Sequence, residues 1–159
     1  MADDPRSRQR RKADVLATLA GPVADAWVAT AAAGDPYLVP LTLAWFRERL
    51  LLATARSSPT VRNLTASGRA RIGFGPTRDV VLIDAVLEAT IPVVEAAEEG
   101  AAYAAQNDWD PRTAGEAYVF LVLRLERVQA WREENELAGR ELMRDGRWLP
   151  AEPEEMETR

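Results

Sequence analysis

The segment LLATARSSPTVRNL, residues 51–64, interrupts an apolar run with hydroxyl and guanidinium side chains. These side chains belong to Arg56, Ser57, Ser58, Thr60 and Arg62. A short helix is expected to follow. Its free backbone N–H groups and positive dipole end would favour an anion, and the arginines would add charge-assisted hydrogen bonds. The same pattern fits a capped loop in which Ser58 is the N-cap and Pro59 the first helical residue. The local sequence leaves these two interpretations about even.

The chain contains neither cysteine nor histidine. A Ser-His-Asp triad, a thiolate nucleophile, a zinc–sulfur site and a His-ligated metal or haem are therefore excluded for this chain alone. Carboxylates, hydroxyls, Tyr, Lys and Arg remain for catalysis. Asp84 and Glu88 form one carboxylate pair, but on an alternating strand they are better interpreted as solvent-facing. A two-carboxylate glycosidase would also need a large aromatic cleft, so this class is disfavoured.

The 159-residue chain has a formal net charge of −5 and is 47% hydrophobic. This composition predicts one domain and argues against a general nucleic-acid binder, which would carry a basic face. The basic residues near the start are interpreted as a solvated terminus: Arg6, Arg8, Arg10, Arg11 and Lys12. No apolar run approaches the roughly 20 residues that cross a bilayer, and no secretory signal is recognisable. We therefore expect a cytoplasmic protein without a membrane partner.

The apolar pattern predicts an N-terminal helix within residues 1–21, capped by Asp4 with Pro5 as its first residue. Strands are predicted over residues 26–32, 37–46, 50–54, 70–74, 80–94 and 118–131, and further helices over residues 59–66 and 95–107. Pro40 removes a ladder donor from the second strand, which must therefore lie at a sheet edge or a bulge at that point.

Two long segments carry the clearest alternation. In residues 80–94, the side chains expected to share one face are Val81, Ile83, Ala85, Leu87, Ala89, Ile91 and Val93. In residues 118–131 the apolar phase shifts by one residue, which predicts a bulge near Glu126-Arg127.

Six closely spaced strands with short flanking helices favour a mainly β (α+β) fold, a six-stranded antiparallel barrel rather than a parallel α/β sheet. We expect this barrel to form a single domain over residues 1–150. Residues 151–159 are predicted to be an acidic, disordered tail.

The order of these segments resembles the pyridoxamine 5'-phosphate oxidase-like, FMN-binding split β-barrel family. The resemblance covers residues 27–88, and the later helix and closing strand follow in the family's order. Its most telling motifs are the turn and strand at Gly34, Pro36 and Pro40, the LLATARSSPTVRNL segment and the strand RARIGFG. The resemblance implies a split β-barrel that forms a homodimer, with the flavin at the interface between the two copies.

In that family, strand backbone meets the flavin ring, and the segment after the third strand holds the phosphate. The residues implied along the ring are Val39, Pro40, Leu41, Thr42, Ala53 and Thr54. Those implied around the phosphate are Arg56, Ser57, Ser58, Thr60, Arg62 and Asn63. Arg78 precedes a strand that resembles one touching the ring edge. The family commonly has Lys or Arg at the positions of Pro59 and Thr60, so Arg56 or Arg62 would have to compensate here.

The resemblance implies a flavin-dependent oxidoreductase that transfers a hydride to or from a small organic substrate. Because the flavin carries the hydride, a chain without His or Cys can still be such an enzyme. FMN is the expected cofactor, with the deazaflavin F420 as the alternative. A flavin-binding carrier or sensor without turnover, and a barrel that has lost its cofactor, remain open. A homodimer is also expected from the residues, because residues 37–45 and 81–93 carry more apolar side chains than one small barrel can bury.

Overall fold

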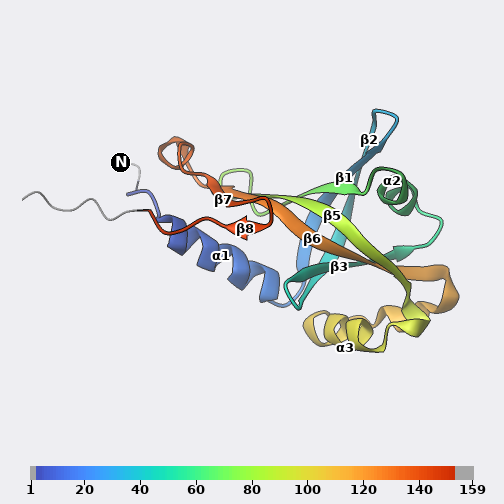
Figure 1. Cartoon of the computed structure of the whole chain (residues 1–159). Helices are drawn as coiled ribbons and strands as arrows, with labels where there is room; N and C mark the ends of the chain where they lie inside the picture. The colour runs from blue at the N-terminus through green and yellow to red at the C-terminus, as the bar shows by residue number, and fades with distance from the viewer. Residues whose placement is uncertain (1–2, 153–159) are drawn as a thin grey trace, which may run out of the picture.

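The computed structural model describes residues 3–152, and its centre is a closed antiparallel barrel of six strands. These strands are β1 (Ala24–Ala32), β2 (Asp35–Phe46), β3 (Arg49–Ala55), β4 (Arg69–Phe74), β5 (Val80–Pro92) and β6 (Tyr118–Trp131). Their order around the ring is β1-β2-β3-β6-β5-β4, and β4 pairs with β1 to close it. The predicted six-stranded antiparallel barrel is thus confirmed (Figure 1). Residues 153–159, most of the predicted tail, lie outside the described residues.

The helices α1 (Arg8–Ala20), α2 (Pro59–Ser67) and α3 (Ala97–Gln106) flank the barrel. Short 3₁₀ turns occur at η1 (Val93–Glu95), η2 (Pro111–Ala117) and η3 (Glu134–Glu136). A hairpin of β7 (Glu141–Arg144) and β8 (Arg147–Trp148) extends the sheet beyond β6. In Figure 1, α1 lies with β7 and β8 at one end of the molecule, whereas α2 and α3 lie at the other end.

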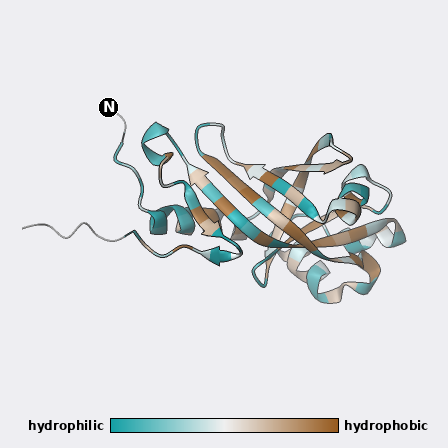
Figure 2. Cartoon of the chain, turned by 45° about the horizontal axis from the view of Figure 1, so that its top comes forward, coloured by the Kyte–Doolittle hydropathy of each residue, from teal (hydrophilic) through white to brown (hydrophobic). Residues whose placement is uncertain are grey.

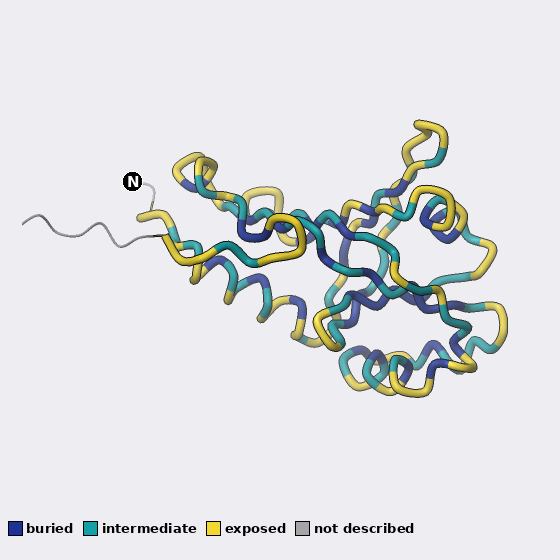
Figure 3. The backbone as a smooth tube through the Cα atoms, viewed as in Figure 1, coloured by how far each residue is buried: buried dark blue, intermediate teal, exposed yellow. Residues whose placement is uncertain are grey.

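Two apolar clusters hold these layers together. The main cluster fills the barrel and includes Leu52 and Leu121, with Leu19 of α1 packed against it. The outer cluster lies on the opposite face of β2, β3 and β6, beneath α3, and includes Leu51, Tyr103 and Phe120. Neighbouring residues of β3 therefore pack in different clusters, because successive side chains of a strand point to opposite faces. Figure 2 shows that the hydrophobic residues are concentrated on the strands, and Figure 3 shows that the same strands are the most buried part of the chain.

Strand β6 carries the bulge predicted near residues 126–127. Asp84 of β5 pairs with Arg127, whereas the next residue, Ala85, pairs with Leu125, so Glu126 is the extra residue. The one-residue shift in apolar phase was therefore a correct sign of a bulge.

Strand β5 carries a second bulge, which the sequence did not reveal. Glu88 is the extra residue, lying between Leu87 and Ala89, whose partners in β6 are adjacent residues. Because side chains alternate along a strand, one inserted residue reverses the face of every residue that follows. Ile91 consequently packs in the outer cluster, whereas Ile83 packs in the barrel. The expectation of one shared face is wrong beyond the bulge.

Pro40 lies at a sheet edge, as predicted. It pairs with Trp27 of β1, but β2 pairs with β3 only from Leu43 to Phe46. Within the described chain, the other edge of residues 35–42 therefore has no strand beside it, and the missing N–H of Pro40 costs no ladder hydrogen bond. The β1–β2 hairpin extends beyond the barrel, and its tip is exposed (Figure 3).

Helix α1 begins later than predicted. Its N-cap is Ser7, whose hydroxyl accepts a hydrogen bond from the Arg10 N–H (3.2 Å). The expectation that Asp4 caps the helix and that Pro5 is its first residue is therefore wrong. A serine hydroxyl three residues before an available N–H caps a helix equally well, and the sequence offered both positions.

Two arginines in the basic run are not solvated. Arg11 is buried, and its Nη1 donates to the carbonyls of Ala130 (3.1 Å) and Gly139 (2.6 Å). Arg6 forms an ion pair with the buried Glu136 (2.8 Å). The interpretation of a solvated terminus is wrong for these two residues, because their partners come from the far end of the chain.

Candidate functional site

The connection from β3 to α2 is a capped loop. Ser58 is the N-cap of α2, since its hydroxyl accepts a hydrogen bond from the Val61 N–H (3.3 Å), and Pro59 takes the first helical position. The Ser58 N–H donates to the Ala55 carbonyl (2.9 Å). The capped-loop interpretation of the sequence therefore describes the backbone. Of residues 58–61, only Thr60 then retains an N–H without one of these partners, because Pro59 has none. The dipole of the first turn remains in place, so the geometry is also compatible with an anion.

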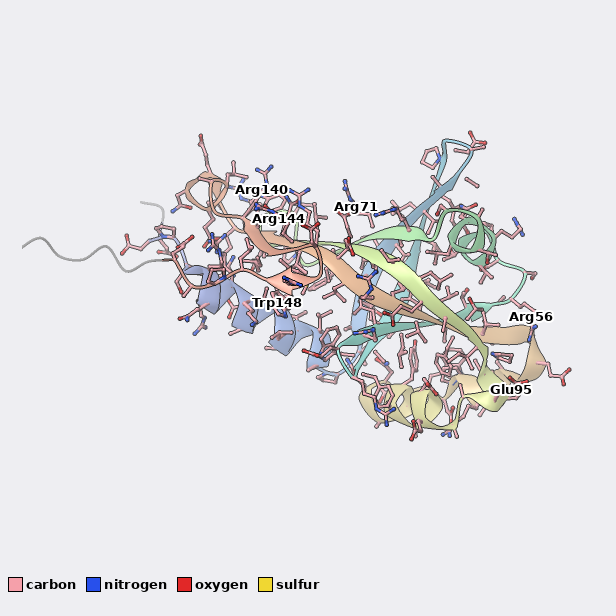
Figure 4. The ribbon with its side chains drawn as sticks, viewed as in Figure 1. Arg56, Arg71, Glu95, Arg140, Arg144 and Trp148 are labelled. Atoms are coloured by element: carbon pink, nitrogen blue, oxygen red, sulfur yellow. The ribbon has the colours of Figure 1, made fainter. Side chains whose placement is uncertain are left out.

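Positive charge around α2 is not neutralised within the described chain. Across residues 3–152, Arg56 and Arg62 have no carboxylate oxygen within 4.0 Å, and neither has Arg69 at the other end of the helix. Arg62 Nη1 donates to the Ser57 carbonyl (2.6 Å), which holds its guanidinium beside the loop. In Figure 4, Arg56 lies at the α2–α3 end of the molecule, far from Arg140 and Arg144.

A charge run in the sequence could have revealed this arrangement. Residues 49–78 include six arginines and no acidic residue, although the whole chain has a net charge of −5. The short motif drew attention to Arg56 and Arg62 but not to Arg69. The longer window would have included Arg69, since a local excess of one charge sign creates a field that extends beyond any single motif.

Two of the predicted phosphate residues hold α2 in place. Thr60 is itself a residue of α2 and is buried. Asn63 Nδ2 donates to Thr30 Oγ1 of β1 (3.1 Å), and Thr30 pairs with Tyr37 of β2. The free-edge part of β2, two residues before the predicted ring segment, and the helix that follows the predicted phosphate loop are therefore connected through β1.

The predicted ring residues of β2 lie on its free edge. Val39 and Leu41 are partly buried against the main cluster, whereas Pro40 is exposed on the other face. The Thr42 hydroxyl donates to Asp25 Oδ1 of β1 (2.6 Å). This segment therefore offers a backbone edge without a strand beside it, rather than a row of side chains.

The predicted ring residues of β3 are fully paired on one side. Ala53 pairs with Phe120 and Thr54 with Val119 of β6. The side chain of Ala53 is packed in the outer cluster. A ligand beside this part of β3 would meet mainly its backbone.

Arg78 does not join the other predicted residues within one chain. It lies in the β4–β5 connection, at the end of the molecule opposite α2 (Figure 1). Its guanidinium donates to both carboxylate oxygens of Glu133, at 2.7 and 3.0 Å. Arg78 is thus already paired, unlike Arg56 and Arg62.

Three polar side chains of α3 and its C-cap bind the backbone of β2 and were not predicted from the sequence. They are here called the α3 clamp: Tyr103, Gln106 and Asn107. Tyr103 Oη donates to the Thr42 carbonyl (3.1 Å), and Asn107 Nδ2 donates to the Leu43 carbonyl (3.2 Å). The clamp residues are three and four positions apart in an alanine-rich segment, and this helical spacing was the available signal.

Gln106 is the member of the clamp that connects three elements. Its Oε1 accepts from the Trp45 N–H of β2 (2.8 Å), and its Nε2 donates to the carbonyls of Leu19 (2.6 Å) and Gly21 (2.8 Å) at the end of α1. Burial raises the pKa of Tyr103 to about 12, and the charge of Asp25 adds to this shift. Tyr103 is therefore a neutral hydrogen-bond donor at physiological pH.

A groove of about 690 Å³ lies beside the C-terminal end of α2. Four arginines from three strands line it, together with Asp84, Glu126 and Asp145: Arg69 and Arg71 of β4, Arg127 of β6 and Arg144 of β7. Arg71 is paired with Asp84 (2.6 Å), and Arg127 and Arg144 are both paired with Glu141. Arg69 is thus the groove's arginine without a carboxylate partner in the described part of the chain.

The three later tryptophans have separate surroundings. Trp109 is partly exposed and packs edge-on against Tyr118, with ring centroids 5.6 Å apart. Arg140 lies over the ring of Trp131, and Lys12 lies over the ring of Trp148. These contacts give Trp131 and Trp148 packing roles at the α1 end of the molecule.

Residues 3–152 contain no cluster of three or more acidic side chains arranged to hold a metal ion. No helix within them is long and apolar enough to cross a membrane.

No protein-family model and no curated protein matches the sequence. Solved structures do match. An F420 reductase superposes with a TM-score of 0.58 at 20% identity, over 70% of this chain and 93% of that one. An FAD-binding protein from Mesorhizobium loti gives 0.56 at 21% identity, over 73% and 90%. A pyridoxamine 5'-phosphate oxidase-like protein from Listeria innocua gives 0.57 at 15% identity, over 77% and 98%.

The chain has the split-barrel fold of the pyridoxamine 5'-phosphate oxidase-like proteins. The resemblance noted in the sequence is therefore confirmed at the level of fold. The three neighbours are named for three different cofactors or substrates. At these identities the likeness concerns the fold, and the cofactor has to be argued from this chain's own residues.

Proposed function

We propose that this split barrel binds a flavin-type cofactor, FMN or F420, and acts as an oxidoreductase on a small organic substrate. One observation carries the proposal: the unneutralised Arg56 and Arg62 flank the start of α2, which is connected through β1 to the free edge of β2. A phosphate suits the arginines and the helix N-terminus, and a planar ring with polar edges suits an unpaired strand backbone.

A bound flavin or deazaflavin would itself accept or donate the hydride. In this proposal, Arg56, Ser57 and Arg62 bind the phosphate, while Ser58 keeps α2 capped beside it. Residues 39–42 and the backbone at Ala53 and Thr54 orient the ring. The protein must also exclude water from the ring. In a single chain, the surface beside the free edge of β2 remains open to solvent.

A homodimer would cover that surface. Leu38 is 60% exposed and Trp27 55% exposed, on the outer side of the β1–β2 hairpin next to the free edge. Large apolar side chains grouped in this way are typical of an interface. A second copy placed here would enclose a ring that lies along residues 39–42. Such a copy could also bring its own Arg78 near the ring, which a single chain does not.

F420 remains a specific second candidate because of Arg69. FMN ends in one phosphate, whereas F420 carries a phosphodiester and a tail of carboxylates. Arg69 lies at the opposite end of α2 from Arg56, in the arginine-lined groove. A second anionic group on the ligand would account for a second unneutralised arginine, whereas FMN would leave Arg69 unused.

Titration with FMN and with F420, followed by absorbance and fluorescence, tests the proposal. We expect Arg56→Ala and Arg62→Ala each to weaken binding by about 10- to 100-fold, the effect of losing a hydrogen bond to a charged group. Arg147→Ala is the matched control, because Arg147 is also exposed and unpaired in the described chain but lies on β8. Arg69→Ala should weaken F420 binding and leave FMN binding unchanged. If all four variants bound both cofactors with wild-type affinity, the phosphate of the cofactor would have to bind elsewhere.

Turnover is tested separately. An oxidoreductase should be reduced by a donor and reoxidised by its substrate, whereas a carrier or sensor would bind the cofactor and remain inert. Rapid-mixing absorbance with reduced nicotinamide donors and candidate unsaturated acceptors distinguishes these functions.

A further inference from the structure

The α3 clamp acts where β2 changes its neighbours. Pairing of β2 with β1 begins at the hairpin and ends at Leu43, and pairing with β3 starts at that same residue. The clamp binds the carbonyls of Thr42 and Leu43 and the N–H of Trp45. It therefore fixes β2 at the junction between the closed barrel and the free edge of residues 35–42.

Tyr103 is the clamp residue that touches the free edge itself. It is only 2% exposed, so its hydroxyl requires an internal partner. The partner is the carbonyl of Thr42, the last residue of the predicted ring segment. The Thr42 hydroxyl is engaged at the same time by Asp25. The bond to the carbonyl restrains the orientation of the peptide group of Thr42, and the bond from the hydroxyl restrains its side chain.

The ring of Tyr103 has its own support, independent of the hydroxyl. It packs against Phe120 with centroids 5.7 Å apart and edge-on against Trp109 at 6.3 Å. Deleting the hydroxyl therefore leaves the aromatic packing in place. This separation makes it possible to test the hydrogen bond apart from the stability of α3.

We propose that Tyr103 is a positioning residue for the cofactor: its hydrogen bond to the Thr42 carbonyl sets the backbone edge along which the ring lies. The inference rests on the proposed function, because this edge concerns a ligand only if a ring binds there. Tyr103 acts through Thr42 and does not touch the cofactor. Its effect should therefore appear in how the ring is held and in its spectrum.

The test compares Tyr103→Phe with wild type, and Tyr118→Phe serves as the control. Tyr118 belongs to the same aromatic group, and its hydroxyl makes no hydrogen bond within the described residues. We expect Tyr103→Phe to weaken FMN binding about three- to tenfold, as for the loss of one neutral hydrogen bond, and to shift the visible absorption of bound FMN. In the cofactor-free protein, amide hydrogen exchange of residues 39–43 should become faster. Tyr118→Phe should change none of these readouts.

The outcomes separate the two proposals. If the wild type binds neither FMN nor F420, the proposed function fails, and this inference fails with it. If the wild type binds FMN and Tyr103→Phe binds it with the same affinity and spectrum, only the positioning role is overturned. Faster exchange without any change in FMN affinity or spectrum overturns it as well, because Tyr103 would then be purely structural.

Discussion

Glu136 shows how much one buried side chain can contribute in an acidic chain. Arg6 donates to its carboxylate from the backbone N–H and from two side-chain nitrogens, and the Arg132 N–H donates as well. These hydrogen bonds, above all those from the Arg6 side chain, hold the pKa of Glu136 at about 2, below its ordinary value of 4.5. The residue is 4% exposed, so solvent screening is weak.

The lowered pKa predicts a pH dependence of stability. A carboxyl group whose pKa is lower in the folded state stabilises the fold above its unfolded pKa, and this contribution is lost as the pH falls from about 4.5 toward 2. We expect a loss on the order of 3 kcal/mol from this group. Urea unfolding between pH 6 and pH 2 measures it. Glu136→Gln should be less stable at neutral pH and should show a flatter acid profile; a profile identical to wild type would contradict the prediction.

The same residues show where sequence reasoning stops. The basic run with Arg6 and Arg11 was correctly noticed, but its partners Glu136 and Gly139 lie more than a hundred positions away. No local pattern encodes such a pairing. Ser58 is the opposite case, because its hydroxyl, Pro59 and the helix they begin are adjacent in the chain, and the predicted cap is observed.

At the scale of elements, the hairpin turns differ in strain. The β2–β3 turn places Arg47 (φ 51°) and Glu48 (φ 58°) in the left-handed region, whereas the β1–β2 turn has Gly34 (φ 83°) as its second residue. A non-glycine residue in this region costs on the order of 1 kcal/mol. The β2–β3 turn therefore retains strain that a glycine would relieve.

Substitution at this turn should stabilise the protein. We expect Glu48→Gly to raise the free energy of unfolding by up to about 0.5 kcal/mol, which is the relief of strain less the greater freedom of glycine in the unfolded chain. Gly34→Ala is the converse control and should lower it by about 1 kcal/mol. A Cβ at Gly34 would meet nothing within 4 Å, so the loss would come from φ alone. Chemical denaturation gives both values, and a destabilised Glu48→Gly would refute the strain argument.

An irregularity within a strand can be predicted from the sequence only where the apolar pattern changes at that point. The bulge at Glu126 was visible because the apolar phase on β6 shifts there. The bulge at Glu88 was not, since the residues after it are apolar or small on both faces and fit either phase. The α3 clamp was missed for a related reason: polar residues near a helix end usually face solvent, and only the fold brings β2 beneath them.

At the scale of the whole molecule, the spacing of the strands predicted an antiparallel barrel and the family resemblance predicted its split-barrel topology, whereas the assembly has to be argued from the surface. On the outer face of the β1–β2 hairpin, Leu38 is directly opposite Ala29, and Trp27 is directly opposite Pro40. This side of the hairpin therefore presents a continuous apolar strip. Burying one large side chain of this kind contributes about 1.5–3 kcal/mol, so two copies in contact across the strip would gain from several such side chains.

The proposed homodimer predicts a mass in solution and a loss of cofactor binding when its interface is broken. Light scattering at micromolar concentration should give twice the chain mass of 17.6 kDa. Leu38→Glu should give the single-chain mass, because a carboxylate would have to be buried unpaired at the interface. It should also weaken FMN binding, since the ring would lose its cover.

Val94→Glu is the matched control, because Val94 is a comparably exposed apolar residue located on η1, away from this strip. A wild-type monomer, or a Leu38→Glu variant that stays dimeric, would show that the strip is not the interface; a monomeric variant with full FMN affinity would show that one copy holds the ring unaided.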